Sequence, residues 1–430
     1  MKESGKISFW VAVLMSVNII VGAGIFVSPG SMTAAAGSIS FLGWPLTALL
    51  FLPIVWCIAQ AARLFPGEGG FYYYGSAGIN PTAGFIAQWA YLIGYLGTAT
   101  ALCIVLRNKV VTQLGFAFAA DHPLMFNALI VLFFSLLNLM NISYISRLQS
   151  GITLLKLLPL FFVITALAWY WNPGITYAIA DFPKLTSTIP VAIFAYWGFE
   201  SCCNLGHLLE GGPSRVGSVV MTAFFVTTAV YMFFHLGLLH IMGVANVASQ
   251  EIARFPLFMG LSESTASMLV VCIGGAILLS VCNTIFGASL ANIININMLA
   301  GKKLIFGKNL LTKTNRYGRP TMAVIIHGLV LWTFLCFITD KNVAFSLTNV
   351  GICIAFFVTV LAVLLACLRN RSYFNLAVAV IAFVSCGIAS YLSWVALGDS
   401  LVDRLLSIAP LAAGLIVGLG MYAVQKRKTA

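Results

Sequence analysis

Twelve apolar segments, each close to the length of a membrane-spanning helix, follow one another along the chain. A helix needs about 20 apolar residues to cross the hydrocarbon core of a bilayer. All twelve are expected to be helical, because lipid cannot satisfy the polar groups of an open strand edge. The sequence therefore predicts an all-α polytopic membrane protein. The segments cover residues 8–32, 38–62, 82–106, 124–143, 152–172, 186–206, 217–242, 267–298, 320–339, 343–367, 374–397 and 405–425.

The composition supports this prediction. Of the 430 residues, 61% are apolar and only 8% are charged, whereas about a quarter of the residues in soluble domains are charged. So few charged side chains cannot coat the surface of a soluble enzyme of this length, and the apolar content excludes a disordered or fibrous chain. The longest polar connection is residues 298–320, so any functional site is expected to lie between the helices.

The distribution of positive charge predicts the orientation of the chain. Twelve spans place both termini on one side of the membrane. Sixteen of the 23 Lys and Arg residues fall on that side and six on the other, while Lys156 lies within a span. Since Lys and Arg gather on the cytoplasmic side, we expect both termini to be cytoplasmic, in the cell (inner) membrane. The net charge of +12 thus indicates topology and contact with anionic membrane lipid, not nucleic acid.

The residues that most often bind metals or form disulfides show no organised pattern. The ten cysteines lie singly in apolar segments, except for Cys202 and Cys203, and no Cys-x-x-Cys spacing occurs. We therefore expect free, buried thiols rather than disulfides or a zinc site. His235 and His240 lie five residues apart, which places them on different faces of a helix. We expect no cofactor and no metal ion.

The first apolar segment contains two glycines around one alanine, Gly22-Ala23-Gly24, in mid-membrane. Small residues often serve close helix packing, although that use favours a spacing of four residues. The alternative is an unwound stretch whose free backbone amides face a cavity and bind an anionic group, as in transporters with broken helices. The motif alone leaves both interpretations open.

The sixth apolar segment carries Glu200, two residues after Gly198. A charged side chain at the bilayer centre costs roughly 2.5–3.5 kcal/mol on insertion scales and is therefore seldom present without a use. One interpretation is a structural, hydrogen-bonded carboxyl group. The interpretation we favour is a second broken helix, with Glu200 acting in gating or in the response to pH.

The two glycine motifs also indicate an internal repeat. Gly22 and Gly198 are 176 residues apart, and each belongs to the first segment in a run of five. This spacing predicts two inverted repeats, residues 8–172 and 186–367, each beginning with a broken helix. Residues 374–425 add two helices, and residues 1–430 are expected to form a single transporter domain.

Several motifs together resemble those of the amino acid–polyamine–organocation transporters, along the whole chain. They are the first-span glycine motif followed by Pro29-Gly30, the loop from Phe65 to Gly75, Gly198-Phe199-Glu200-Ser201, and the segment Asn315–Pro320. Within that superfamily the chain looks nearest to the basic amino acid/polyamine antiporters. The resemblance implies a LeuT-type fold with five-plus-five inverted repeats, and transport of amino acids or amines by alternating access.

The resemblance also implies roles for individual residues. The family's first-span motif holds the substrate carboxylate and maps onto Gly22–Gly24. The aromatic residue that covers the substrate maps onto Phe194, and a tyrosine near the gate maps onto Tyr91. The glutamate implicated in gating and pH response maps onto Glu200.

Three features depart from the arginine exchangers of this family, and one is that their eighth-span aromatic residue has no clear counterpart here, with only Phe286 nearby. A polar third-span residue that helps to bind their substrate falls on Ala99, and the fifth span carries Lys156, a lysine that they mostly lack. Lys156 resembles the fifth-span lysine of sodium-independent carriers of neutral amino acids. We expect its ammonium group to replace a bound sodium ion near Gly22 and to be linked to protons. Snorkelling toward the cytoplasmic interface is the alternative.

The predicted function is secondary active transport of amino acids across the cytoplasmic membrane, as an amino acid/amine antiporter. Sodium-independent, proton-coupled symport is the alternative. A channel and a membrane-embedded enzyme are remote alternatives, because the sequence contains neither a large extramembrane sensor nor an HExxH pair. The sequence leaves open which amino acid or amine is carried and whether the chain forms a homodimer.

Overall fold

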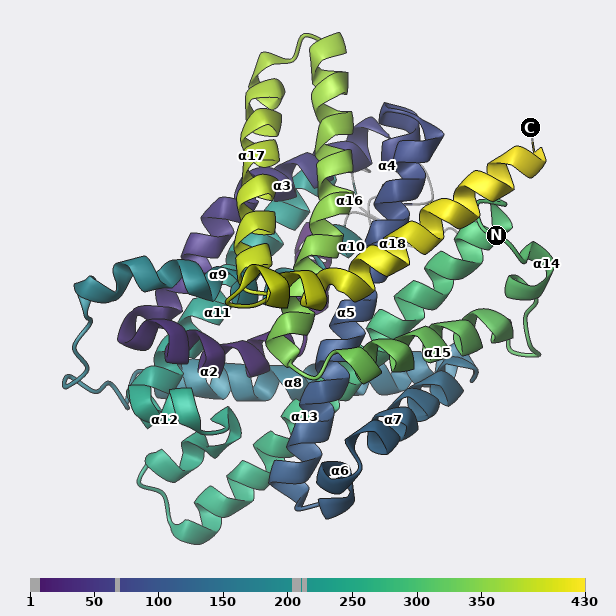
Figure 1. The fold of residues 1–430 in the computed structure, drawn as a ribbon. Coiled ribbons are helices and arrows are strands. Elements are labelled where there is room, and N and C mark those ends of the chain that lie inside the picture. Colours follow the sequence, from purple (N-terminus) through teal and green to yellow (C-terminus); the bar gives the residue numbers. More distant parts are fainter. Residues whose placement is uncertain (1–7, 66–69, 203–209, 211–214, 430) are drawn as a thin grey trace. The chain divides into compact units, whose positions relative to one another are not determined.

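The computed structural model describes residues 8–65, 70–202, 210 and 215–429. Over these residues the regular structure is helical, apart from an isolated bridge between Thr314 and Pro320 (Figure 1). The prediction of an all-helical chain is therefore confirmed for this part. Residues 66–69 of the loop motif lie outside the described residues.

Seven helical segments of the described chain are long and apolar enough to cross a membrane. The first, Gly24–Leu64, contains α2 (Gly24–Ala36), the 3-10 helix η1 (Gly37–Leu42) and α3 (Gly43–Leu64). The others are α5 (Pro81–Leu114), α11 (Val216–Met242), α13 (Glu263–Gly301), α16 (Lys341–Arg369), α17 (Tyr373–Val395) and α18 (Leu401–Thr429). Further apolar helices are α1 (Phe9–Ile20), α7 (Pro123–Asn138), α8 (Ile142–Ala166) and α15 (Thr321–Phe337).

The chain divides into two compact units. The first comprises residues 1–87, 158–273 and 353–392, and the second comprises residues 88–157, 274–352 and 393–430. Each unit takes segments from both halves of the chain. Consequently α5, α8, α13, α16 and, with its last three residues, α17 each contribute one part to either unit.

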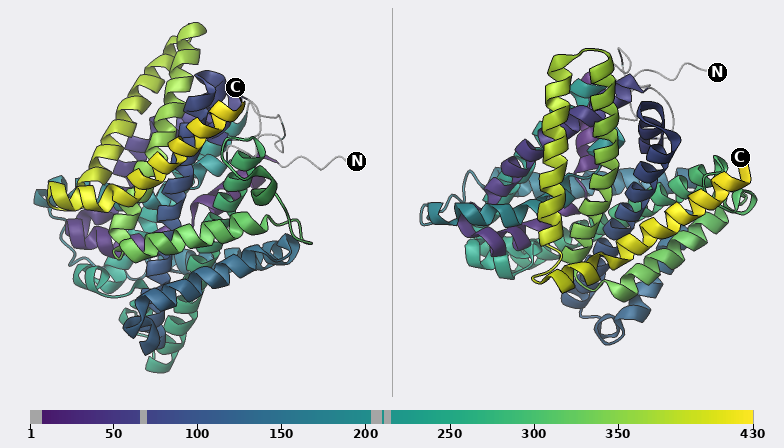
Figure 2. Two further views of the ribbon diagram at one scale, coloured as in Figure 1. Left: turned by 45° about the vertical axis from the view of Figure 1, so that its right-hand side comes forward. Right: turned by 45° about the horizontal axis from the view of Figure 1, so that its top comes forward.

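The first unit contains two places where one helix ends and another begins almost at once. α1 is followed by α2 after three residues, and α9 (Ile189–Tyr196) is followed by α10 (Phe199–Cys202) after two. α11 packs along α1 and α3, and α2 packs against α9. Elsewhere in this unit, the parts of α16 and α17 within residues 353–392 run antiparallel, side by side (Figures 1 and 2).

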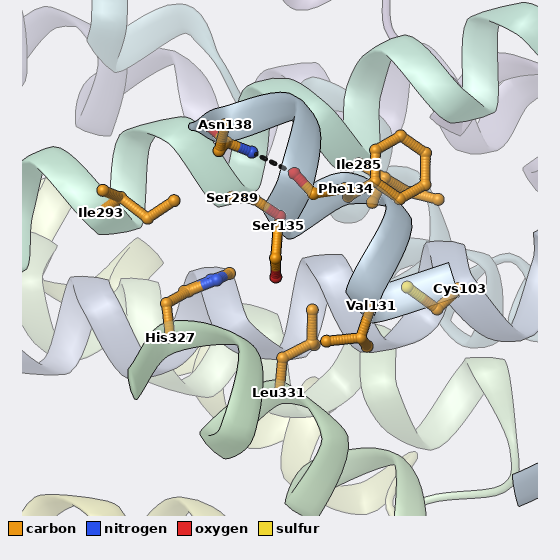
Figure 3. Close-up of a pocket in the computed structure, with 10 residues that line it drawn as sticks. All are labelled: Cys103, Val131, Phe134, Ser135, Asn138, Ile285, Ser289, Ile293, His327 and Leu331. Atoms are coloured by element: carbon orange, nitrogen blue, oxygen red, sulfur yellow. Dashed lines mark hydrogen bonds between the residues drawn. The ribbon is translucent and has the colours of Figure 1, made fainter. Parts of the chain in front are cut away.

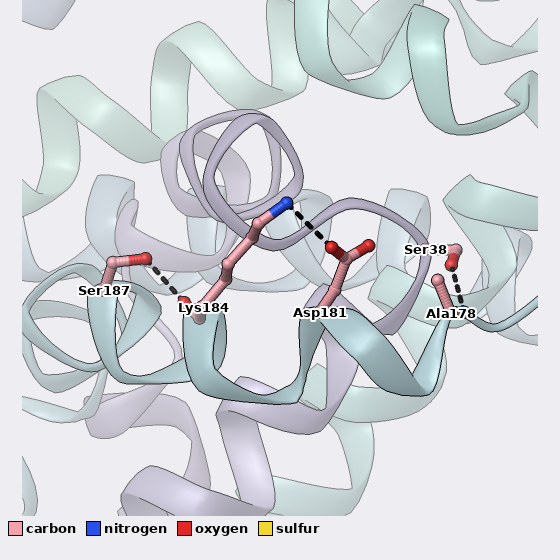
Figure 4. A network of polar contacts seen from close by, with 5 residues as sticks. All are labelled: Ser38, Ala178, Asp181, Lys184 and Ser187. Atoms are coloured by element: carbon pink, nitrogen blue, oxygen red, sulfur yellow. Dashed lines mark hydrogen bonds and ion pairs between the residues drawn. The ribbon is translucent and has the colours of Figure 1, made fainter.

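A 3-10 helix, η2 (Ile179–Thr188), precedes α9, and Figure 4 shows Asp181, Lys184 and Ser187 along it. Lys184 Nζ lies 2.7 Å from Asp181 Oδ1, and the Ser187 hydroxyl donates to the Lys184 carbonyl over 2.6 Å. The Ala178 amide donates to the Ser38 hydroxyl over 3.4 Å, which connects η2 to η1. The two 3-10 helices also pack against α2, so the start of α9 is held beside the end of α2.

In the second unit, α7 and α15 pack side by side (Figure 2). Arg319, just before α15, donates from Nε to the Asn138 carbonyl over 2.9 Å, and the Asn315 side-chain amide donates to the Leu139 carbonyl over 2.8 Å. The last carbonyls of a helix lack partners within it and favour a nearby cation. The sequence motif Asn315–Pro320 therefore caps the end of α7.

Candidate functional site

The first helix interruption consists of Val21–Ala23. The Gly22 amide donates to the Ile20 carbonyl over 2.8 Å, and Val21 between them has φ −69° and ψ 85°. This is close to the geometry of an inverse γ-turn, and it ends α1. A new helix of 13 residues, α2, begins at Gly24. Because the first amides of a helix have no acceptor within it, the start of α2 presents backbone donors.

The second interruption consists of Trp197 and Gly198. Gly198 has φ 116°, a conformation that residues with a side chain rarely adopt. Its amide donates to Glu200 Oε2 over 2.9 Å. The Glu200 side chain is only 5% exposed, and its oxygen satisfies a backbone donor that the break leaves outside a helix. Capping this turn is thus one structural role of Glu200.

The two interruptions lie against each other within the first unit. A Cβ atom on Gly24 would lie 2.6 Å from the Ala195 Cα atom. A Cβ atom on Gly198 would lie 3.0 Å from the Ile19 carbonyl oxygen. Each turn therefore depends on a glycine, because the backbone beside the other turn approaches it closely.

One hydroxyl group joins the two interruptions. Tyr231 on α11 is fully buried, and its OH donates to the Ile20 carbonyl over 3.1 Å and to the Ala195 carbonyl over 2.9 Å. Both carbonyls lie in the last turn of an interrupted helix, where oxygens lack helical partners. A hydroxyl has a single hydrogen, so the two carbonyls share it. Tyr231 is not among the predicted site residues. The sequence signal for it is a tyrosine within an apolar segment, because a buried tyrosine needs a polar partner.

The two histidines of α11 have separate partners. His235 bonds to Thr33, Ser40 and Trp44. The His240 ring stacks on Trp171 with 3.9 Å between centroids, its Nδ1 accepts from the Asn172 amide over 3.0 Å, and its Nε2 lies 2.8 Å from the Tyr177 hydroxyl. Each imidazole is therefore engaged at its own place along the helix.

The remaining predicted site residues divide between the units. Phe194 is 5% exposed and precedes Ala195 on α9, so it lies at the second interruption together with Glu200. Tyr91 and Lys156 belong to the second unit. The Tyr91 ring lies 4.6 Å from the Tyr95 ring, and Lys156 on α8 is 4% exposed. The structure thus brings the glycine motif, Phe194 and Glu200 into one unit.

A small pocket lies in the second unit, between α5, α7, α13 and α15 (Figure 3). The Asn138 side-chain amide donates to the Phe134 carbonyl over 2.9 Å. Among the described residues, Asn138 Oδ1, Ser289 Oγ and His327 Nε2 have no partner. The volume open to a water-sized sphere is about 0 Å³, far below the roughly 300–1,000 Å³ of ligand pockets. We therefore do not assign a substrate to it.

Residues 7–419 match the family described as amino acid permease. The chain belongs to this family. Its members are transporters and not enzymes, and the chain is an integral membrane protein of the amino acid–polyamine–organocation superfamily. The resemblance found in the sequence is thereby confirmed at the level of the superfamily.

Three curated proteins are similar to this amino acid permease. It is 23% identical over 330 residues to the serine/threonine exchanger SteT of Bacillus subtilis (strain 168), covering 74% of each chain. It is 24% identical over 289 residues to the arginine/agmatine antiporter of Chlamydia pneumoniae, and 26% identical over 301 residues to that of Chlamydia caviae. Both antiporter matches cover 62% of this chain and 57% of the relative.

Proposed function

We propose that this permease exchanges amino acids, or an amino acid for an amine, across the cell membrane by alternating access. The observation that carries the proposal is the pair of adjoining helix interruptions in the first unit. In transporters with inverted repeats, interrupted helices bind the substrate near the bilayer midplane. Three relatives named as exchangers or antiporters favour exchange over symport.

The proposal assigns the two interruptions to the first and sixth of twelve transmembrane helices in a LeuT-type fold. α1 and α2 then form one broken helix, and α9 and α10 form the other. The repeats are residues 8–172 and 186–367, followed by two helices over residues 374–425, and both termini are cytoplasmic. This arrangement accounts for the excess of Lys and Arg on the side of the termini.

We propose an α-amino acid with a free carboxylate as the substrate. The first amides of α2, at Gly24 and Ile25, together with the helix dipole, favour an anion at this end. The substrate ammonium group would meet carbonyl oxygens at the ends of α1 and α9. Phe194 would cover the substrate, and Tyr91 would lie near the gate.

Purified protein in lipid vesicles tests this function. Uptake of a labelled amino acid should saturate with concentration and should accelerate when the same unlabelled amino acid is inside. A channel would show neither behaviour in that range, so flux that neither saturates nor accelerates would overturn the proposal. Competition by the twenty amino acids and common polyamines would then identify the substrate.

Proton-coupled symport is the second candidate, and Lys156 favours it because an ammonium group can release a proton. The two candidates differ in vesicles that contain no internal substrate. Exchange gives little uptake there, even when the outside is acidified. Symport gives uptake that rises with the imposed proton gradient.

Lys156 also leads us to propose that transport needs no sodium. Its side chain is 4% exposed, which disfavours snorkelling along lipid, since a charge inside a membrane protein usually serves a function. Uptake in sodium-free medium should equal uptake in sodium. Lys156→Ala should lower uptake roughly tenfold or more, because a charge buried for function is lost.

The matched control for this experiment is Lys184→Ala. Lys184 is 62% exposed and pairs with Asp181 in η2, and exposed ion pairs contribute little. Its variant should transport at the wild-type rate. Strict sodium dependence of the wild type, or full activity of Lys156→Ala, would contradict the proposed role.

A further inference from the structure

His235 lies within α11, fully buried, with a partner at each ring nitrogen. Nδ1 lies 3.1 Å from Trp44 Nε1, and Nε2 lies 2.8 Å from the Thr33 hydroxyl and 3.2 Å from the Ser40 hydroxyl. An indole nitrogen only donates, so Nδ1 accepts this hydrogen bond and carries no proton. The neutral imidazole therefore has its proton on Nε2, which donates to the hydroxyl groups.

Trp44 connects this imidazole to the helix interruptions. Its carbonyl accepts from the Tyr196 hydroxyl over 3.0 Å. Its ring centroid lies 4.9 Å from that of Tyr231 and 6.0 Å from that of Tyr196. Tyr196 is the last residue of α9, and Tyr231 bonds to a carbonyl at the end of each interrupted helix. The Trp44 indole, which bonds to His235, thus packs on Tyr196 and on Tyr231. Tyr196 ends α9, and Tyr231 links both turns.

We propose that His235 is a positioning residue for the substrate site. It fixes the Trp44 indole, and Trp44 keeps Tyr196 and Tyr231 where they hold the ends of α1 and α9. The inference rests on the proposed function, because it concerns the site where the substrate would bind. His235 itself does not touch the substrate.

The same geometry argues against a role for His235 in proton coupling. A proton on Nδ1 would point at the indole N–H and break the bond to Trp44, since both atoms would then be donors. Within the described chain, the polar partners of this imidazole are the uncharged Thr33, Ser40 and Trp44. None of these three partners is a carboxylate that could stabilise an imidazolium.

Three variants test the inference. His235→Leu and Trp44→Phe each remove the bond between imidazole and indole, so each should raise the KM for uptake about tenfold, with a smaller change in maximal rate. The double variant should have nearly the same KM as either single variant, because the two residues act through one contact. His235→Gln should keep KM within about threefold, because its carbonyl can accept from Trp44 and its amide can donate to Thr33.

His240→Gln is the matched control. It makes the same substitution five residues further along α11, at an imidazole that bonds to Asn172 and Tyr177 instead. Its KM should stay at the wild-type value. The pH profile of uptake by His235→Gln should superimpose on that of the wild type, which a proton-coupling histidine would not allow.

Hydrogen exchange of the purified variants separates this inference from the proposed function, because it needs no substrate. His235→Leu should speed exchange at residues 20–24 and 195–198, and His235→Gln should not. If the wild type carries no amino acid but this exchange pattern is found, the proposed function fails and the positioning role stands. Unchanged exchange in His235→Leu, a wild-type KM in that variant, or a shifted pH profile in His235→Gln would overturn the inference.

Discussion

The turn between α1 and α2 and the turn between α9 and α10 lie against each other, yet they differ in what their amides bind. At the first turn, Gly22 bonds back to Ile20 within the turn, and the first turn of α2 carries no acidic side chain. At the second turn, the Gly198 amide already bonds to the carboxylate of Glu200, at the start of α10. The first turn leads into a helix without an acidic residue in its first turn, and the second turn carries its own carboxyl group.

This difference indicates how an amino acid would be oriented. Negative charge is favoured at a helix N-terminus, and at the second turn the Glu200 side chain already occupies the Gly198 amide. The substrate carboxylate is therefore expected at the start of α2. The two turns differ in backbone as well: Gly198 has φ 116°, whereas Gly24 is not among the glycines of positive φ. Gly24 is thus required for space, and Gly198 mainly for its conformation.

The largest effect is expected from Gly24→Val. The new Cβ atom would lie 2.6 Å from the Ala195 Cα atom, a backbone atom that cannot turn aside. The two turns should separate, so uptake should fall below detection while membrane insertion and expression persist. Gly420→Val on α18 is the control, because a Cβ atom there meets nothing within 4 Å. If Gly24→Val takes up substrate at the wild-type rate, the first turn does not form part of the substrate site.

Gly198→Ala should have the next largest effect, through conformation. A residue forced into a sparsely populated backbone region costs about 1–3 kcal/mol, and its Cβ atom would also lie 3.0 Å from the Ile19 carbonyl. The purified variant should unfold at a lower temperature and transport more slowly. Gly243→Ala isolates the conformational part, since Gly243 has φ 81° with nothing within 4 Å. If Gly198→Ala is as stable as the wild type, the second turn is not held by its glycine.

The sequence could locate both turns, because glycine pairs and a carboxylate are rare within apolar segments. It could also predict that the chain is helical and crosses a membrane, since apolar length decides this. It could not identify Tyr231 or His235. Their roles depend on which face of α11 meets α1 and α3, and an apolar segment with little amphipathic pattern does not reveal that phase.

The sequence also does not indicate how the helices group into the two compact units. The predicted repeats, residues 8–172 and 186–367, follow chain order, whereas each compact unit takes segments from both. Likewise, the sequence indicates Asn315–Pro320 only as a family motif. Its bonds to the end of α7 join residues more than 170 positions apart, and no local pattern indicates such a partner.

Glu200→Gln is expected to have the smallest effect. It tests most directly how the second turn differs from the first. Glutamine keeps a side-chain oxygen that can accept the Gly198 amide, so stability should change little and transport should persist. Only the charge is lost, and the pH dependence of uptake should flatten if Glu200 couples transport to pH.

Glu200→Leu separates this charge from the cap. It leaves the buried Gly198 amide without its acceptor, at a cost of about 1–3 kcal/mol, so this variant should unfold at a lower temperature than Glu200→Gln. The comparison between the two substitutions divides the role of the residue into two measurable parts. A pH profile of Glu200→Gln that superimposes on the wild type, together with an unstable Glu200→Leu, would leave Glu200 with the structural role alone. The second turn would then serve to hold α10 in place, and proton sensing would have to come from another residue.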